Sequence, residues 1–519
     1  MPPLPLRRRS LLAAAAMAPA LPRGTLAQPS RQKLVVAVAD LPAGLEPARD
    51  MGIVGTRISW SLYDTLIRRD FLSTPGGGGA KLEPGLAASW KRESPSELII
   101  NLREGVRFHN GDLLHADDVA FTFSAGRMWG EKSLIPDAKN YFGVLASVEA
   151  LDAKSVRFRT RGPDVLLEQR LASWASWIVN KRHYQAVGID AFARNPVGTG
   201  PLKPRSFTRD STVLFDAFDD YWMGRPGFSS VEFRKVPEVS TRVAGLVSGE
   251  FDIVTNLPPD QLDTLARYNH VEARSVVLAN AHLLTFDMRD PVIADKRIRH
   301  ALSHAIDRKL LVETLWNGKA VVPASHNYPE YGEMFLPGRS LPFDPERARR
   351  LLREAGYRGQ KITYRTMPNY YTNALAAAEI LTEMWKEVGI NAELQVVESF
   401  AQMQGPGQQI GNTSNSTRLP DPLGAIWPSW GPNTSFQTRG MWAKDSAAAF
   451  NEAGRALEVE ADPAKRKALW ARMLDAWEDE LPATILYLPL ESYGVRKSLK
   501  WQPYSFYYMD LRAYNLGLG

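Results

Sequence analysis

The stretch from Leu82 to Phe123 constrains the fold most, because its pattern predicts one compact strand–turn–helix unit. Residues 97–102 alternate with the two-residue period of a strand that has one face buried more deeply. Asn110-Gly111 is a dipeptide typical of hairpin turns. Asp117-Asp118 falls where the first turn of a helix favours negative charge. The stretch has no catalytic signature, so we expect it to be scaffold.

Runs of residues in this stretch also stand in the order found in one family. PGLA-SW, LR-GV-FHNG and A-DV-F follow one another between Pro84 and Phe123. On these runs the chain resembles the family 5 extracellular solute-binding proteins, the peptide and nickel receptors of ABC importers. NPVGTGP at 195–201 and RHALSHAIDR at 299–308 continue the resemblance, which spans nearly all of the chain from residue 45 onward. The chain departs from the family at His115, where relatives have Ser or Thr, and at Leu202, where they have Tyr.

The resemblance implies an α/β fold of the periplasmic binding protein kind. That fold is two-lobed (type II, in the class with an extra β-rich subdomain), with mixed sheets flanked by helices and a ligand cleft between the lobes. Alternating helices and strands between Asp344 and Val397 independently predict an α/β second lobe. The expected bounds are a signal peptide at 1–27, lobe I at 28–75, 191–280 and 485–519, its extra subdomain at 76–190, and lobe II at 281–484, with crossings near 278–285 and 484–492.

The N-terminus has the pattern of an export signal. Arg7-Arg8-Arg9 precedes an Ala-rich apolar run to Leu21, and Thr25-Leu26-Ala27 supplies a small-residue cleavage site. Residues 8–12 also resemble the twin-arginine export motif. No other run approaches the about 18 apolar residues that a membrane span needs. We therefore expect an exported protein.

Charge and cysteine content narrow the expected partners. The formal net charge of +6 includes four arginines and no acid before Gln28, which leaves +2 for the mature chain. So small a charge gives no electrostatic reason to expect nucleic acid or an anionic membrane. The absence of cysteine excludes disulfides, thiolate metal sites and a lipidated N-terminal Cys. We expect a soluble periplasmic monomer whose partners are its ligand and the permease and ATPase of an ABC importer.

No catalytic motif is visible in the sequence. We find no S-x-x-K, no H-E-x-x-H, no G-x-S-x-G and no recognisable Ser/His/Asp arrangement. His300 and His304 are four residues apart, a spacing that suits a metal on one helix face, but no third ligand has a recognisable spacing. A solvated or cleft-facing pair is the better interpretation. We expect no enzyme, no metal and no cofactor.

The candidate ligand site lies in the segment from Gln402 to Arg439, which is rich in polar residues and predicted to be irregular. Long irregular segments in compact domains are usually functional or disordered. Within it, RLPDPLGAIWPSW sets Arg418 three residues before Asp421, with Trp427 and Trp430 close behind. A peptide is a zwitterion, so a cation, an anion and apolar walls suit it.

The resemblance assigns roles to these residues. Peptide receptors of the family hold the ligand's amino terminus with an aspartate near an Asp-Pro, which makes Asp421 the first choice for that role. Arg418 is a reasonable carboxylate partner because a zwitterion also needs a cation. Tyr370 and Tyr371, just before a predicted helix, are weaker candidates. The alternative is that Arg418 and Asp421 form a loop salt bridge and that the tryptophans belong to the core.

The predicted function is a receptor that captures a di- or oligopeptide between two closing lobes. Other ligands stay open at this point. An oligosaccharide would suit tryptophans beside the amides of Gln408, Gln409, Asn412 and Asn415, and a metal chelate would need His or Arg side chains to converge in the cleft. A periplasmic hydrolase, a different class of protein, would need a nucleophile and a base brought together in space.

Overall fold

A computed structural model describes residues 32–50, 52–73, 78–79, 81–368 and 370–518. The predicted signal peptide and its twin-arginine motif lie outside these residues. Within the described part, no helix combines the length and the apolar character that a membrane crossing requires.

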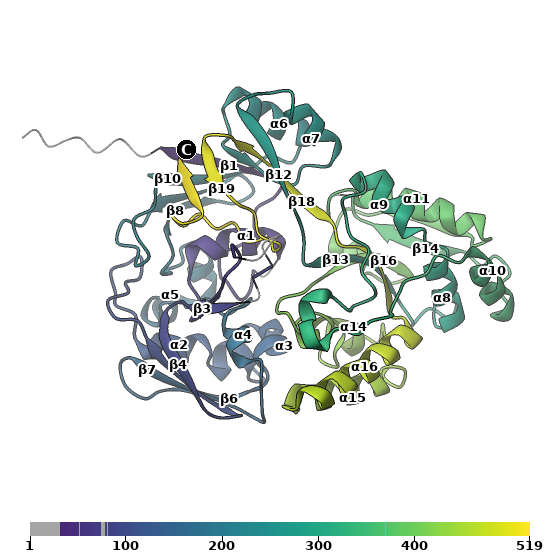
Figure 1. The fold of residues 1–519 in the computed structure, drawn as a ribbon, viewed down its shortest axis with the longest axis horizontal. Helices are drawn as coiled ribbons and strands as arrows, with labels where there is room; N and C mark the ends of the chain where they lie inside the picture. Colours follow the sequence, from purple (N-terminus) through teal and green to yellow (C-terminus); the bar gives the residue numbers. More distant parts are fainter. Residues whose placement is uncertain (1–31, 51, 74–77, 80, 369, 519) are drawn as a thin grey trace, which may run out of the picture. The chain divides into compact units, whose positions relative to one another are not determined.

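A seven-stranded mixed sheet, whose part of the molecule we call lobe I, collects strands from distant parts of the chain. Strand β1 is parallel to β10 and β11, and the C-terminal strand β18 is inserted between β12 and β11 (Figure 1). In spatial order the strands are β12 (Val271–Val277), β18 (Leu490–Arg496), β11 (Ile253–Val254), β1 (Lys33–Val38), β10 (Ser230–Lys235), β9 (Thr212–Ala217) and β8 (Leu202–Thr208). Its helices are α1 (Ile53–Leu62), α5 (Lys181–Arg194), α6 (Val239–Ser248) and α7 (Asp260–Leu265).

A four-stranded antiparallel sheet contains strands from the stretch Leu82 to Phe123. Its order is β4 (Ala87–Ser94), β5 (Glu97–Leu102), β7 (Ser155–Thr160) and β6 (Leu145–Ala150), with helices α2 (Ala116–Thr122), α3 (Lys139–Phe142) and α4 (Leu167–Leu171). The strand, the turn with Gly111 at φ +88° and the helix are confirmed. His109 fixes this turn to the 195–201 segment, because its Nδ1 accepts from the Gly198 N–H and its Nε2 lies 2.9 Å from the Gly200 carbonyl.

A five-stranded mixed sheet forms the centre of the part that we call lobe II. Its order is β15 (Ala392–Val396), β14 (Ile362–Thr366), β16 (Ile410–Ser416), β13 (Asn280–Phe286) and β17 (Ala483–Tyr487). Its longer helices are α8 (Lys296–His304), α9 (Arg308–Trp316), α10 (Pro345–Glu354), α11 (Ala374–Glu387), α15 (Ala448–Val459) and α16 (Pro463–Glu480), and its short ones are α12 (Phe400–Met403), α13 (Ile426–Trp430) and α14 (Ser435–Thr438). Small two-stranded sheets pair β2 (Ile67–Arg69) with β3 (Leu82–Pro84), and β19 (Leu499–Trp501) with β20 (Leu516–Leu518).

The chain passes between the two large sheets twice. The first crossing lies between β12 and β13 at residues 278–279, and the second between β17 and β18 at 488–489. The Leu278 N–H donates to the Pro489 carbonyl at 2.9 Å, so the two crossings run side by side. Strand β17 extends to Tyr487, three residues beyond the bound expected for lobe II.

The expectation that 402–439 is irregular is wrong at its centre. Residues 410–416 form β16, which pairs with β14 on one side and with β13 on the other. The sequence of this strand, IGNTSNS, contains one large apolar residue and gives no strand signal. Its buried amides are accommodated by partners from elsewhere in lobe II: Asn412 donates to the Tyr371 hydroxyl, and Asn415 accepts from Ser429.

Lobe I contains a buried ionic cluster that anchors the C-terminal segment. Arg512 donates to Asp64 at 2.7 Å and to Asp510 at 3.1 Å, and its guanidinium lies over the rings of Trp60 and Tyr221. The Asp64 carboxylate also accepts from the Tyr221 hydroxyl at 2.9 Å. Every charge in the cluster thus has a partner, which is the condition for burying ions at tolerable cost.

Candidate ligand-binding site

A cavity of about 680 Å³ lies beside the two crossings. Lobe I lines it with the start of α1 and the ends of β1 and β10, while lobe II contributes Trp316, His282 and the residues around Tyr370. The crossing segments themselves supply Leu278 and Glu491. Small-molecule sites have volumes of about 300–1,000 Å³. A solute in this cavity would therefore touch both lobes.

The carboxylates of the cavity wall are already paired. Arg57 donates to Glu491 at 3.0 Å, with both side chains buried, and Asn256 donates to the second oxygen of Glu491 at 3.1 Å. Lys235 lies 2.7 Å from Asp40. Arg242 donates instead to backbone carbonyls, and burial lowers its pKa to about 10. The wall consequently holds one more cation than anions.

Tyr370 and Tyr371 both lie on the cavity wall. The Tyr371 ring stacks on the His282 imidazole with 3.6 Å between centroids. Burial lowers the pKa of His282 to about 3, so this imidazole is neutral at physiological pH. The Tyr370 hydroxyl lies 3.4 Å from the Ser414 hydroxyl of β16. These contacts order the wall, and a ligand contact by either tyrosine stays a prediction.

Asp421 is 6% exposed and has contacts within lobe II. Its Oδ1 accepts from the Leu423 N–H at 2.9 Å, and its Oδ2 accepts from Arg466 of α16 at 2.8 Å. Burial raises the pKa of this carboxyl, and the Arg466 charge opposes the shift. The salt bridge to Arg418 that the sequence left open is not formed, because Asp421 pairs with Arg466. An ammonium contact by Asp421 stays a prediction. The ammonium would have to share carboxylate oxygens that already accept hydrogen bonds from Leu423 and Arg466.

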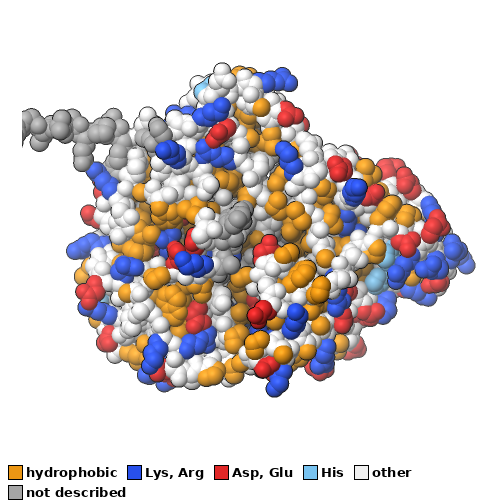
Figure 2. All heavy atoms as spheres, viewed as in Figure 1, with side chains coloured by type: hydrophobic (Ala, Val, Ile, Leu, Met, Phe, Trp, Pro, Cys, Tyr) orange, Lys and Arg blue, Asp and Glu red, His pale blue; other side chains and the backbone are white. Residues whose placement is uncertain are grey.

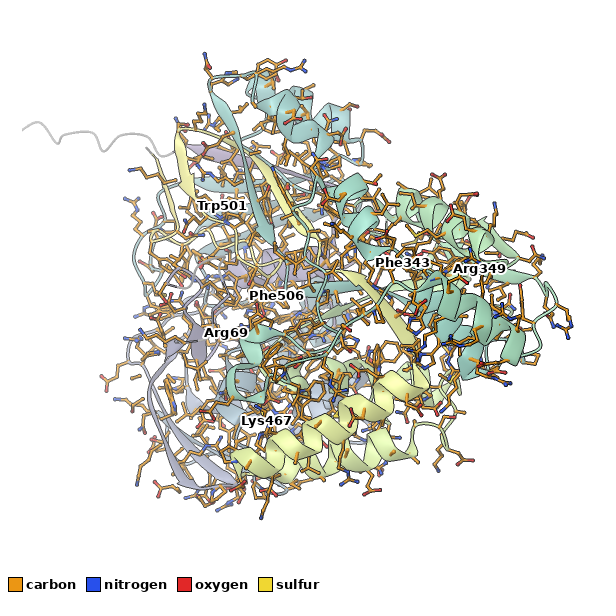
Figure 3. The ribbon with its side chains drawn as sticks, turned by 45° about the vertical axis from the view of Figure 1, so that its right-hand side comes forward. Arg69, Phe343, Arg349, Lys467, Trp501 and Phe506 are labelled. Carbon is orange, nitrogen blue, oxygen red and sulfur yellow. The ribbon has the colours of Figure 1, made fainter. Side chains whose placement is uncertain are left out.

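Arg418 contacts aromatic rings of the lobe I subdomain rather than Asp421. Its Cζ lies 3.9 Å from the ring centroid of Trp174 and 4.9 Å from that of Tyr141. Its carbonyl accepts from Arg69 and from Ser173, each at 3.0 Å. Arg69, which makes the first of these two bonds, is labelled in Figure 3. The structure thus separates the two charges that the sequence places three residues apart.

Trp427 and Trp430 pack into the core of lobe II. Trp430 is 1% exposed and lies against Phe436, with ring centroids 4.5 Å apart. Trp427 packs on Phe450 of α15 at 5.8 Å. The contacts favour the alternative that the tryptophans are core residues, and a ligand contact by either indole stays a prediction.

The two histidines on α8 differ in burial, because His300 is partly exposed and His304 is buried. The burial of His304 is contrary to the expectation that the pair lies outside the core, and the Nε2 of His300 lies 2.9 Å from the Asp479 carbonyl on α16. Across the described ranges no group of three or more metal-capable side chains forms.

Sequence reasoning missed the cavity residues of lobe I. Arg57 and Glu491 are separated by 434 positions, and neither stands in a motif that points to the other. On the lobe II side, His282 was missed as well, because it occupies an apolar-looking strand. No local signal could have joined these residues, because the two crossings bring them together only in the folded chain.

The comparisons with known proteins decide the family. Residues 81–437 match the family described as bacterial extracellular solute-binding proteins, family 5 Middle. The chain belongs to this family. The predicted family and the predicted two-lobed α/β fold are therefore confirmed.

Relatives of this family-5 chain cover most of its length. It is 27% identical over 424 residues to Di/tripeptide-binding protein 1 of Pseudomonas aeruginosa, covering 76% of this chain and 77% of that one. A dipeptide binding protein from Pseudoalteromonas sp. SM9913, solved with Met-Leu, superposes with a TM-score of 0.84 at 22% identity, covering 94% of this chain and 100% of the other. DppA from Helicobacter pylori, solved with the peptide STSA, gives 0.81 at 21% identity, covering 94% and 98%.

Proposed function

We propose that this chain is the periplasmic receptor of an ABC importer and that it captures a di- or oligopeptide between its two lobes. The observation that carries the proposal is the cavity of about 680 Å³ at the crossings, in a chain whose family binds solutes. The relatives named for peptides support the ligand class. The solute leaves unchanged, since the family and the structural neighbours are binding proteins.

Capture proceeds by closure about the two crossings. In the proposed division, lobe I comprises 28–75, 191–280 and 485–519, its subdomain 76–190, and lobe II 281–484. Only the short segments at 278–279 and 488–489 join the two large sheets, so rotation there changes few backbone angles. A solute that contacts both walls of the cavity stabilises the closed arrangement because it loses those contacts on opening.

The receptor acts outside the cytoplasmic membrane in this proposal. The signal at 1–27 directs export, and the closed receptor delivers its solute to the permease and ATPase as a monomer. Figure 2 shows Lys and Arg interspersed with Asp and Glu over the visible face, which suits a protein that diffuses freely rather than adsorbing to polyanions.

A thermal-shift screen of dipeptides, oligopeptides, oligosaccharides and nickel chelates tests the function. A peptide present at 100 times its Kd should stabilise the folded protein by about 2.7 kcal/mol. Calorimetry on each hit gives the affinity, and mass spectrometry of the recovered solute checks that it is intact. Stabilisation by sugars without any peptide would refute the peptide proposal, and a hydrolysed solute would refute the receptor proposal.

Paired tyrosine variants locate the site within the same assay. Tyr370→Ala removes an aromatic wall of the cavity and should weaken peptide binding about tenfold, the effect of losing roughly 1.4 kcal/mol of contact. Tyr268→Ala is the matched control, because Tyr268 is 39% exposed and lies outside the cavity wall. Equal affinities for the two variants would place the ligand elsewhere.

A further inference from the structure

Arg418 is a half-buried residue whose positive charge no anion balances within the described part of the chain. Among the residues that the structure describes, its guanidinium forms no ion pair, and neither its Nε nor its Nη1 has a hydrogen-bond acceptor, although both are shielded from solvent. Desolvation lowers the pKa of the group. A buried donor without an acceptor is costly, and a buried charge without a partner more so. The arrangement is therefore incomplete as a purely structural feature.

The aromatic neighbours hold the guanidinium flat and leave its edge unused. Trp174 and Tyr141 contact its face, through cation–π attraction. The N–H groups of an arginine lie in the guanidinium plane, so stacking on the face does not satisfy them. The rings belong to the lobe I side and Arg418 to lobe II, so this contact joins the two lobes.

The surroundings supply positive potential and no spare acid. Arg69, which donates to the Arg418 carbonyl, gives its other donors to the carbonyls of Gly78 and Gly79. The acids nearby are engaged: Asp421 with Arg466, and Asp164 with Arg170 at 3.1 Å. The described side chains here thus offer a cation to a ligand, and no carboxylate without a partner to hold an ammonium.

The start of helix α1 independently favours an anionic ligand. Its first turn has no acidic residue and its N-cap no side-chain hydrogen bond, and it begins at the cavity wall with Ile53 and Val54. The helix dipole favours an anion at such an end. Trp174 connects the two features, since its Nε1 donates to Thr56 of α1 at 2.7 Å.

We propose that Arg418 binds a carboxylate of the solute, and that the receptor selects acids whose amine is blocked or absent over zwitterionic peptides. This inference rests on the proposed function, because it places the solute between the lobes. It narrows the ligand class to N-acylated or otherwise anionic peptide-like acids. In the closed complex the carboxylate accepts from the edge of the guanidinium, while Trp174 and Tyr141 keep that edge dry.

One dipeptide in four forms tests the selectivity by calorimetry. The probes are Ala-Phe, N-acetyl-Ala-Phe, Ala-Phe-amide and N-acetyl-Ala-Phe-amide, with N-acetylphenylalanine and glutarate as acids that are not peptides. We expect N-acetyl-Ala-Phe to bind more tightly than Ala-Phe, so that equal affinities would overturn the preference for a blocked amine. Each amide should bind about 50-fold more weakly than its acid, since a site that bonds a missing group is left with unpaired donors. The acid–amide ratio reports on Arg418 directly.

Variants assign the effect to the residue. Arg418→Gln should bring the acid–amide ratio close to one, and Arg418→Lys, which keeps the charge without the planar fork, should give an intermediate ratio. Arg439→Gln is the control, because Arg439 is exposed and its side chain donates to Gln404. Should Arg418→Gln fail to fold, the Lys variant and the acid–amide ratio of the unaltered protein still decide the matter.

The outcomes separate this inference from the proposed function. Peptides that bind equally well as acids and amides, or equally well to Arg418→Gln, overturn the inference and leave the peptide receptor standing. Binding of N-acetylphenylalanine or glutarate alone, with loss in Arg418→Gln, overturns the peptide proposal and supports the inference. Failure of every carboxylate to bind overturns both.

Discussion

Two regions of the molecule bury an arginine against a pair of aromatic rings, and only one supplies the counter-charge. Arg512 lies over Trp60 and Tyr221 and is bonded to Asp64 and Asp510. Arg418 lies over Trp174 and Tyr141 with no acid beside it in the described part of the chain. The first arrangement is complete, so its role is to hold the fold. The Arg418 arrangement lacks only an anion, so this difference indicates that an anionic ligand binds at Arg418.

The largest expected effect comes from breaking the complete arrangement. Arg512→Met leaves two buried carboxylates without their cation and should lower the free energy of unfolding by about 3–5 kcal/mol. Urea unfolding measures the loss. Arg205→Met is the control, because its pair with Asp216 at 3.3 Å is exposed and should contribute about 0–1 kcal/mol. A loss below 1 kcal/mol in Arg512→Met would falsify the structural role.

Acidification tests whether the difference between the Arg512 and Arg418 sites is independent of pH. Burial lowers the pKa of His282 and of His326 to about 3, below the ordinary value of about 6.5. The unfolded chain therefore binds more protons between these values, and stability is lost as the pH falls from about 6.5 toward 3. At pH 5 the loss is on the order of 2 kcal/mol per histidine.

The two arginine sites should not contribute to that loss. Burial works against ionisation of Asp64 and Asp510, yet the Arg512 charge outweighs it and lowers the pKa of both carboxyls, which keeps them ionised at pH 5. Unfolding at pH 7.5 and pH 5 measures the change, and His326→Gln is expected to lose less than the unaltered chain, by on the order of 2 kcal/mol. Identical stabilities at the two pH values would contradict the buried, neutral histidines.

A glycine substitution tests whether Trp427, which follows Arg418 in the same segment, is a core residue. A Cβ at Gly454 would lie 2.1 Å from the ring of Trp427, with no room for the indole to withdraw into α15. Gly454→Ala should therefore cost about 1–3 kcal/mol through overpacking, despite the better helix propensity of Ala. Gly249→Ala is unsuitable as a control because its φ is +83°, whereas Gly126→Ala meets nothing within 4 Å. Equal stabilities of the Gly454 and Gly126 variants would indicate a Trp427 free to contact solute.

The smallest stability effect is expected where the charge has no partner. Arg418→Met removes a half-buried cation and keeps most of the apolar volume over Trp174, so unfolding of the ligand-free protein should change by less than about 1 kcal/mol, or become more costly. The same variant should abolish the preference for acids. A loss as large as that of Arg512→Met would mean that Arg418 is structural after all.

The fold could be predicted wherever the determining signals are local. Asp344-Pro345 and Asp462-Pro463 begin α10 and α16, and an N-cap carboxylate followed by proline at N1 is a signal that can be read from adjacent residues. Asp307 likewise separates α8 from α9 and caps the second. The strand at 410–416 could not be predicted, since its polar residues are stabilised by partners outside the strand.

The candidate site was only partly accessible to the same reasoning. Tyr370 and Tyr371 were found from their position before a helix, and they lie on the cavity wall. The partner of Asp421 could not be found, because Arg466 lies 45 positions away on a helix whose other residues are apolar or solvated. Charge pairing across such separations depends on tertiary packing, which leaves no trace in local spacing.

The position of β18 determines when during synthesis lobe I can be completed. Residues 490–496 fill the gap between β11 and β12, and both of these strands leave the ribosome more than 200 residues earlier. Until then the two strands have open edges and no shared neighbour. A chain shortened before Leu490 would expose them permanently and would be prone to edge-to-edge aggregation. Late arrival of this strand also keeps lobe I incompletely folded until nearly the whole chain has been made.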